Sequence, residues 1–184
     1  MKSVAVLVGS LREGSINRQL AKGIARLAED KFVFRFVEIG DLPLYNDDLW
    51  RNPPEPVMRM KREIESSDAV LFVTPEYNRS FSPALKNAID WGTRPWGQNS
   101  WAGKPAAVIG ATPGSTGTAT AQNALRGIVA VVDMIPMAQP ELYFTYKPEF
   151  FGPDADVKDS AVRDLLRQWV ERFSSWVDRL AMSA

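Results

Sequence analysis

The chain has 184 residues, of which 45% are hydrophobic and 24% are charged. This length corresponds to about one domain of ordinary size, and the composition is typical of a globular protein, not of a disordered or fibrous one. The sequence has no cysteine and no histidine, which excludes disulfides, a Ser–His–Asp triad and the common kinds of zinc site. The formal net charge is 0, so no overall field favours binding to nucleic acid.

Targeting and membrane segments are not expected. No stretch approaches the roughly 20 apolar residues that a membrane-spanning helix requires. The apolar run Val4–Val8 is too short for the core of a signal peptide. We therefore expect a single domain over residues 1–184 that works in the cytoplasm without membrane or nucleic-acid partners. An enzyme without histidine and cysteine would rely on a cofactor, and not on a metal site, for difficult chemistry.

Short apolar runs and amphipathic stretches alternate along the chain. Apolar runs predict strands buried on both faces, and apolar residues three or four positions apart predict helices. In chain order the predicted elements are a strand at Val4–Val8, a helix from Ser15, a strand at Phe32–Ile39, a short helix around Val57–Ile64, a strand at Ala69–Val73, a helix from Ser82, a strand at Ala106–Ala111, a helix over Ala121–Val132, a fifth strand at Met134–Met137 that Leu142–Thr145 could extend beyond Pro140, and a long helix over Val162–Leu180.

This alternation of strand and helix predicts a parallel sheet with right-handed crossovers and helices on both faces. Five strands in one domain fit a flavodoxin-like α/β fold, a three-layer sandwich with strand order 2-1-3-4-5. Such sheets bind ligands outside the carboxyl ends of their strands, where the strand order reverses. The loops after the first, third and fourth strands are therefore the candidate binding loops.

The loop after the first strand combines hydroxyl, amide and guanidinium groups at the start of a helix. Ser10, Ser15 and Asn17 supply side-chain donors, and Arg12 and Arg18 add charge. Unpaired N–H groups and the helix dipole favour an anion at such a place, and the forked guanidinium suits a phosphate. The alternative is that Ser15 only caps the helix and the arginines are solvated.

The other two candidate loops differ in character. In the loop after the third strand, Tyr77 and Phe81 could pack against a planar ring while Asn78 and the backbone contact its polar edge; alternatively this segment is a turn whose aromatic residues fill the core. The loop from Gly110 to Thr118 has small residues that allow close approach to a ligand, or it is a flexible surface loop. Together the three loops suit a mononucleotide with a large planar head.

Two segments carry a resemblance to a known family. GSLREGSINR after the first strand and PEYNRSFSPALKNAIDW after the third resemble the NADPH-dependent FMN reductase family, and within it the bacterial quinone and chromate reductases. The similarity extends from Val4 to the last helix. It implies a flavodoxin-like fold that binds FMN without a covalent bond.

The resemblance also assigns residues. By their match to the family pattern, Ser10, Arg12, Ser15 and Asn17 would hold the FMN phosphate, with Arg18 nearby; Pro75, Glu76, Tyr77 and Asn78 would line the isoalloxazine, largely through the backbone; and Ser115 would contact the ring or ribityl side. The family also implies a homodimer or homotetramer, in which Arg126 and Glu141 would make contacts between subunits.

The chemistry that the resemblance implies is a ping-pong reaction. NADPH or NADH would pass a hydride to the flavin N5, and a small-molecule acceptor such as a quinone would then take two electrons in the same place; chromate, azo and nitro compounds are further acceptors. No catalytic side chain is required, and Asn78 would lie near N5. Arg79 and Arg94 are candidates for the charge of the nicotinamide nucleotide, or else are solvated.

Some questions stay open at the level of sequence. Trp50, Trp91, Trp96 and Trp101 could cover the flavin, bury an interface or pack locally. A flavodoxin-type electron carrier is the main alternative function, although such carriers dock through acidic surfaces and this chain is neutral. A regulatory protein that has lost the flavin is a further alternative, against which the retained loop residues argue.

Overall fold

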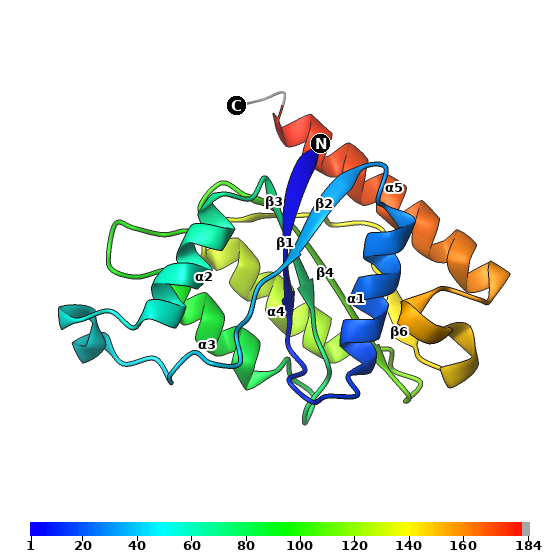
Figure 1. Cartoon of the computed structure of the whole chain (residues 1–184), viewed down its shortest axis with the longest axis horizontal. Coiled ribbons are helices and arrows are strands. Elements are labelled where there is room, and N and C mark those ends of the chain that lie inside the picture. The colour runs from blue at the N-terminus through cyan, green and yellow to red at the C-terminus, as the bar shows by residue number, and fades with distance from the viewer. Residues whose placement is uncertain (182–184) are drawn as a thin grey trace.

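The apolar runs of the sequence form a parallel sheet in the computed structural model, which describes residues 1–181 (Figure 1). The strands are β1 (Lys2–Val8), β2 (Phe32–Phe36), β3 (Ala69–Val73), β4 (Pro105–Thr112), β5 (Ile135–Pro136) and β6 (Tyr143–Thr145). The order in the sheet is β2-β1-β3-β4-β5, with β6 also paired to β4. The predicted order is confirmed, and every pairing of these strands is parallel.

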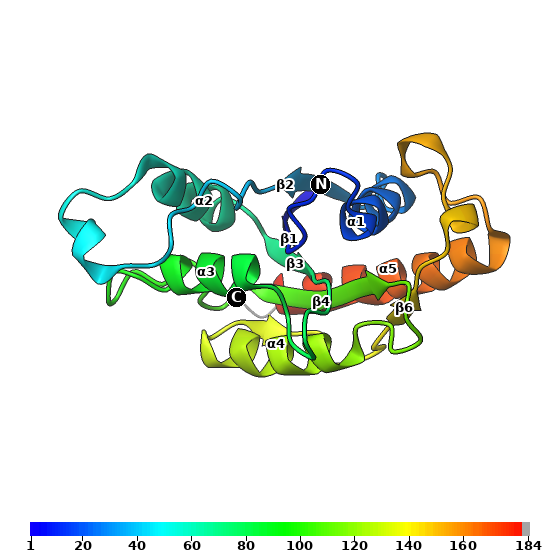
Figure 2. The same ribbon diagram turned by 90° about the horizontal axis from the view of Figure 1, so that it is seen from below.

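Helices cover both faces of the sheet. They are α1 (Ile16–Leu27), α2 (Glu55–Glu65), α3 (Pro83–Gly92), α4 (Ala119–Val131) and α5 (Ser160–Ala181). Because successive side chains of a strand point to opposite faces, Val4, Val6 and Val8 of β1 pack with α1 and α5, whereas Ala5 and Leu7 pack with the other three helices. Figure 2 shows the resulting three layers. None of the helices in residues 1–181 combines the length and apolar character needed to cross a bilayer.

The second strand is shorter than predicted. β2 ends at Phe36 and not at Ile39. The N–H of Val37 still donates to the carbonyl of Val6 at 3.0 Å. Beyond Val37 this segment of the described chain makes no further backbone hydrogen bond to β1, and the carbonyl of Glu38 accepts from Arg59 of α2 at 2.8 Å. The predicted long loop that follows also contains a short 3-10 helix at Asp47–Arg51, and α2 begins at Glu55.

The predicted fifth strand is divided into two pieces. β5 and β6 pair with opposite ends of β4, through Pro105 and Gly110 respectively. Proline has no N–H to donate, so Pro140, which lies between the two pieces, cannot continue a hydrogen-bonded ladder. Side chains add hydrogen bonds here: Trp176 of α5 donates to the carbonyl of Ile135 at 3.1 Å, and Arg126 of α4 donates to that of Met137 at 2.8 Å.

The tryptophans mostly pack locally. Trp91 and Trp101 are fully buried and donate through Nε1 to the carbonyls of Pro43 and Ile89, respectively. The ring of Trp50 lies 5.4 Å from that of Trp91. Trp96, in contrast, is 89% exposed.

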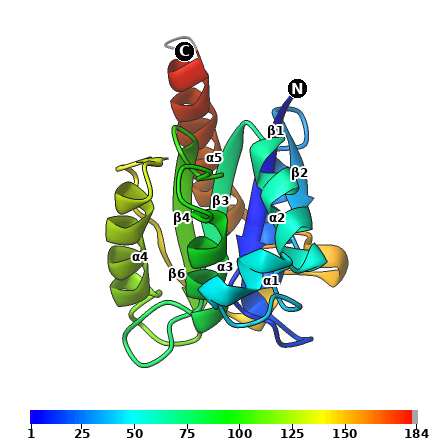
Figure 3. The same ribbon diagram turned by 90° about the vertical axis from the view of Figure 1, so that its left-hand side faces the viewer.

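The chain begins and α5 ends at the edge of the sheet where the strands start (Figures 1 and 3). There Lys2 pairs with Asp178 of α5 at 2.6 Å. The single domain expected over residues 1–184 stays a prediction, and residues 182–184 of it lie outside the described part of the chain.

Candidate functional site

Three loops meet at the carboxyl edge of the sheet. They are residues 9–15 after β1, 74–82 after β3 and 113–118 after β4, at the lower edge of Figure 1. Backbone bonds tie the strand ends together: Gly9 donates to Val73 at 2.9 Å, and Thr74 donates to Ile109 at 2.8 Å. A Cβ atom on Gly110 would lie 2.1 Å from the carbonyl oxygen of Thr74, so only glycine fits between β4 and the second loop.

The first loop presents a run of free backbone donors. In the described chain, the N–H groups of residues 10–17 have no protein acceptor. The last of them belong to the first turn of α1, where the helix dipole also favours an anion. The Ser15 hydroxyl accepts from the N–H of Arg18 at 3.1 Å, which leaves its proton free to donate. Ser10, within the loop, is buried. This loop is suited to bind a phosphate.

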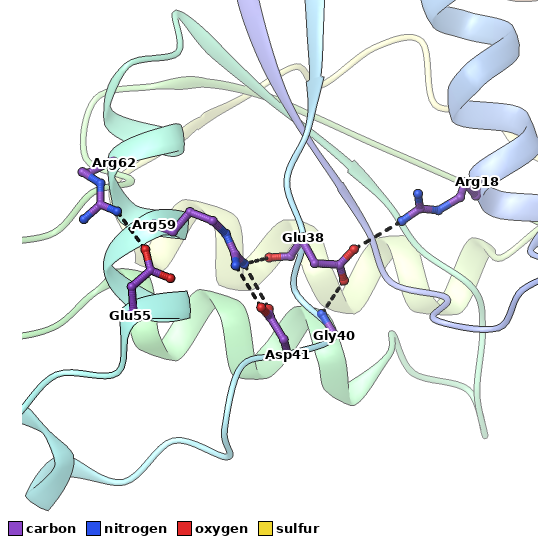
Figure 4. Close-up of polar contacts among 7 residues, drawn as sticks. All are labelled: Arg18, Glu38, Gly40, Asp41, Glu55, Arg59 and Arg62. Atoms are coloured by element: carbon purple, nitrogen blue, oxygen red, sulfur yellow. Dashed lines mark hydrogen bonds and ion pairs between the residues drawn. The ribbon is translucent and has the colours of Figure 1, made fainter.

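The two arginines of this region have different surroundings. Arg12 is exposed, and its Nε donates to the carbonyl of Gly14 at 3.1 Å, so the guanidinium folds over the loop with its terminal N–H groups free. Arg18 of α1 lies 3.9 Å from the carboxylate of Glu38, whose other oxygen accepts from the N–H of Gly40 at 2.8 Å (Figure 4). Arg12 is therefore the cation most available to an anion, whereas Arg18 shares its charge with Glu38.

The segment that carries Glu38 is held by α2. Arg59 donates to both carboxylate oxygens of Asp41, at 2.8 and 3.0 Å, and to the carbonyl of Glu38 (Figure 4). The hydrogen bonds from Arg59 lower the pKa of Asp41 below its usual value. The sequence does not reveal these residues, because no motif marks a carboxylate and an arginine that are 18 positions apart.

Asn17 points into the protein. It is 2% exposed; its Nδ2 donates to the carbonyl of Ala111 at 3.0 Å, and its Oδ1 accepts from the N–H of the same residue at 2.8 Å. The carboxamide thus fastens α1 to the end of β4. An amide nitrogen carries two protons. The carbonyl of Ala111 accepts from one N–H of Asn17 Nδ2, so the other N–H remains available.

The second loop forms a tight turn. Tyr77 and Ser80 exchange backbone hydrogen bonds of 2.9 and 3.0 Å, and the residues between them, Asn78 and Arg79, have φ angles of 51° and 67°. Two positive φ angles define a type I′ turn, a conformation that costs energy in residues other than glycine. Tyr77 is 45% exposed at the edge of this turn, and Phe81 is partly buried in the core.

The third loop presents further backbone donors. The N–H groups of Ser115 and Thr116 have no acceptor within the described residues, and both side chains are exposed. Gly117 follows with a φ of 55°, and a Cβ atom there would lie 2.4 Å from the backbone of Tyr143. The third loop is therefore held at its end by β6, while its tip faces the open edge of the sheet.

Three residues that were predicted to contact the nicotinamide nucleotide or a second subunit lie outside the three loops. Arg94 follows the C-terminus of α3, at the end of that helix opposite the binding loops, so within one chain it is away from the site. Arg126 and Glu141 pair within the chain, with Arg126 Nε 3.4 Å from the Glu141 carboxylate, and their expected contacts between subunits stay a prediction. Tyr143 also donates to Glu141, and this hydrogen bond raises the pKa of the tyrosine.

A parallel sheet of this order, with a loop of free N–H donors after β1 and donor-rich loops beside it, is typical of flavodoxin-like nucleotide-binding proteins. The family model for NADPH-dependent FMN reductase matches residues 2–149, and the chain belongs to that family. It is therefore an oxidoreductase and a flavoprotein with FMN as cofactor and NAD(P)H as donor.

Individual proteins are similar over nearly the whole chain. A 2-hydroxy-1,4-benzoquinone reductase from a Burkholderia species is 45% identical over 174 residues, which are 95% of each protein. A quinone reductase from Pseudomonas putida is 48% identical over 176 residues, 95% of this chain and 94% of that protein. The structure of FerB, a flavoenzyme NAD(P)H:(acceptor) oxidoreductase from Paracoccus denitrificans, superimposes with a TM-score of 0.95 at 50% identity and covers 97% of this chain and 98% of FerB.

Proposed function

We propose that this protein reduces quinones with two electrons from NAD(P)H, through FMN bound by the three loops at the carboxyl edge of the sheet. The observation that carries the proposal is the run of unpaired N–H groups over residues 10–17, next to a second and a third loop suited to a planar ring. The quinone acceptor is supported by the names of two relatives, at 45% and 48% identity.

The first loop fits the phosphate end of FMN. We assign phosphate binding to the N–H groups of this loop, the hydroxyls of Ser10 and Ser15, and the free N–H groups of Arg12. Arg18 adds charge nearby, in competition with Glu38. Asn17 contributes mainly by fixing the start of α1 against β4, and its remaining N–H is the only side-chain donor that it has left for a phosphate.

The second and third loops fit the ring end. Pro75, Glu76, Tyr77 and Asn78 would border the isoalloxazine, largely through backbone groups, and Ser115 would approach from β4. Bound FMN supplies the hydride chemistry. The chain itself binds and orients the ring and keeps water from it, and no side chain is required as a catalytic acid or base. Asn78, at the tip of the turn, is the proposed neighbour of N5.

The first test is the visible absorption spectrum of the purified protein before and after anaerobic addition of NADPH or NADH. We expect a yellow protein whose visible band bleaches with either donor and returns when 1,4-benzoquinone is added, with chromate, azo and nitro compounds compared as acceptors afterwards. A yellow protein that neither nucleotide bleaches would instead support an electron carrier. A colourless protein that cannot take up FMN would refute the cofactor assignment.

We further propose that the protein is a cytoplasmic homodimer or homotetramer. NAD(P)H is a cytoplasmic donor, and a groove of about 660 Å³ between the ends of α3 and α4 is bordered by the highly exposed side chains of Trp96 and Val131. Large exposed apolar residues beside a groove are typical of interaction surfaces. Light scattering after gel filtration tests the oligomeric state, and a monomer at micromolar concentration would refute it. Cell fractionation tests the cytoplasmic location.

A further inference from the structure

Glu76 belongs to the second loop, and its side chain extends to the N-terminus of α4. Its Oε2 accepts from the N–H groups of Thr120 at 3.1 Å and Ala121 at 3.2 Å, and the side chain is only 10% exposed. α4 has no cap of its own, because Thr118 at the N-cap position has a φ of 68° and forms no side-chain cap bond. The first N–H groups of a helix need acceptors, and a negative charge is favourable there. Glu76 therefore caps α4 from a different loop.

The same carboxylate faces the tip of the turn on its other side. Glu76 Oε1 lies 3.8 Å from Nη1 of Arg79, one of the two residues held at positive φ. A non-glycine residue keeps such a conformation only where its surroundings impose it. The type I′ turn is thus joined through Glu76 to the start of α4, which directly follows the third loop.

From these contacts we propose that Glu76 is a positioning residue, which locks the second loop to α4 and so sets the geometry of the ring end of the site. The inference rests on the proposed function, because the ring end is assigned there. It differs from the expectation that Glu76 lines the ring through its backbone, since its side chain acts on Tyr77 and Asn78 through the bridge to α4.

Three substitutions separate the parts of this bridge. Glu76→Ala removes it. Glu76→Asp keeps the charge but is one methylene shorter, so it loses the reach to α4. Glu76→Gln keeps an oxygen acceptor for α4 but loses the charge that faces Arg79. Glu55→Gln is the matched control, because Glu55 is a carboxylate in the first turn of another helix, α2, and pairs with the exposed Arg62.

Hydrogen exchange of the full chain without added flavin tests the bridge itself. We expect Glu76→Ala and Glu76→Asp to lose protection at least tenfold at the amides of Thr120 and Ala121, and together with them at the amides of Tyr77 and Ser80. Glu76→Gln should lose less, and Glu55→Gln should leave all four amides unchanged. Loss at α4 with an unchanged turn would overturn the proposal, because the two segments would then be independent. This measurement does not depend on whether the parent binds FMN.

Flavin-loaded protein tests the consequence for the reaction. We expect Glu76→Ala to lower the single-turnover rate of flavin reduction by NADPH at least tenfold while the FMN dissociation constant changes less than threefold, with Glu76→Gln recovering most of the rate. If Glu76 only capped the helix, Glu76→Ala would lower thermal stability without this difference between the reduction rate and the FMN dissociation constant. A reduction rate within twofold of the parent would overturn the proposal. If Glu76→Ala does not fold, Glu76→Asp replaces it in both measurements. Failure of the parent to bind FMN would refute the proposed function and not the bridge.

Discussion

Asn17→Ala provides a test of how the candidate site is held together. The substitution removes both partners of Ala111, whose N–H and carbonyl are bonded to the carboxamide at 2.8 and 3.0 Å. Each buried backbone group left unpaired costs about 1–3 kcal/mol, and water entering the vacated space recovers part of this. We therefore expect the free energy of unfolding to fall by about 2–4 kcal/mol. For a chain of this length that corresponds to a decrease in Tm of roughly 4–16 °C.

The assay is urea unfolding of flavin-free protein, so that no cofactor contributes to the stability. Asn17→Asp is a useful companion, because it keeps an acceptor for the N–H of Ala111 but places an oxygen against its carbonyl; it should be at least as destabilising. The matched control is Asn123→Ala, at an exposed position of α4, where alanine is a good helix former and little change is expected. An Asn17→Ala protein within about 0.5 kcal/mol of the parent would refute the reasoning.

Three further predictions follow from contacts at the two edges of the sheet. Arg12→Ala should weaken FMN binding about 5- to 150-fold, as expected for the loss of about 1–3 kcal/mol in charged hydrogen bonds; an unchanged dissociation constant in a fluorescence titration would remove Arg12 from the phosphate site. Gly110→Ala should destabilise the fold by at least about 2 kcal/mol in thermal unfolding, because its Cβ would overlap the carbonyl of Thr74, and a stable variant would contradict that close approach. Hydrogen bonds from the backbone N–H and hydroxyl of Ser3, at 2.6 and 2.9 Å, lower the pKa of Asp68 below 3.8. Their contribution to stability is therefore present above pH 3.8 and is lost as the pH falls through the lowered pKa; Asp68→Asn should remove this pH dependence, and parallel pH profiles of parent and variant would contradict it.

The sequence predicted the architecture because its strands are short apolar runs separated by amphipathic helices. Those patterns depend on burial, which periodicity reports directly. The end of β2 was predicted wrongly since Val37 and Ile39 remain buried although they lie beyond its last residue, Phe36. The apolar residues there indicate burial, and they do not indicate pairing with a neighbouring strand. The divided fifth strand was partly visible in the prolines, which interrupt the apolar pattern.

The candidate site was predicted by type more than by role. The first loop lies where the fold and its residues suggested, and its free N–H groups agree with a phosphate site. The prediction could not show that Asn17 binds Ala111, or that Glu76 caps α4, because both are contacts between segments far apart in the sequence. The assignment of Arg94 to the ligand face failed for a topological reason, since a loop that follows a helix lies at the opposite edge from a loop that follows a strand.

The shortness of β5 and its proline also bear on solubility. An edge strand with free carbonyl and N–H groups is a template on which strands of other molecules can add, which leads to aggregation. Here β5 has only two residues. Ile135 and Met137 direct their N–H groups to the start of β4, at 2.9 and 2.7 Å, and the residue between them, Pro136, has no N–H to offer on the outer side. This margin of the sheet thus offers little to an incoming strand, which disfavours edge-to-edge association.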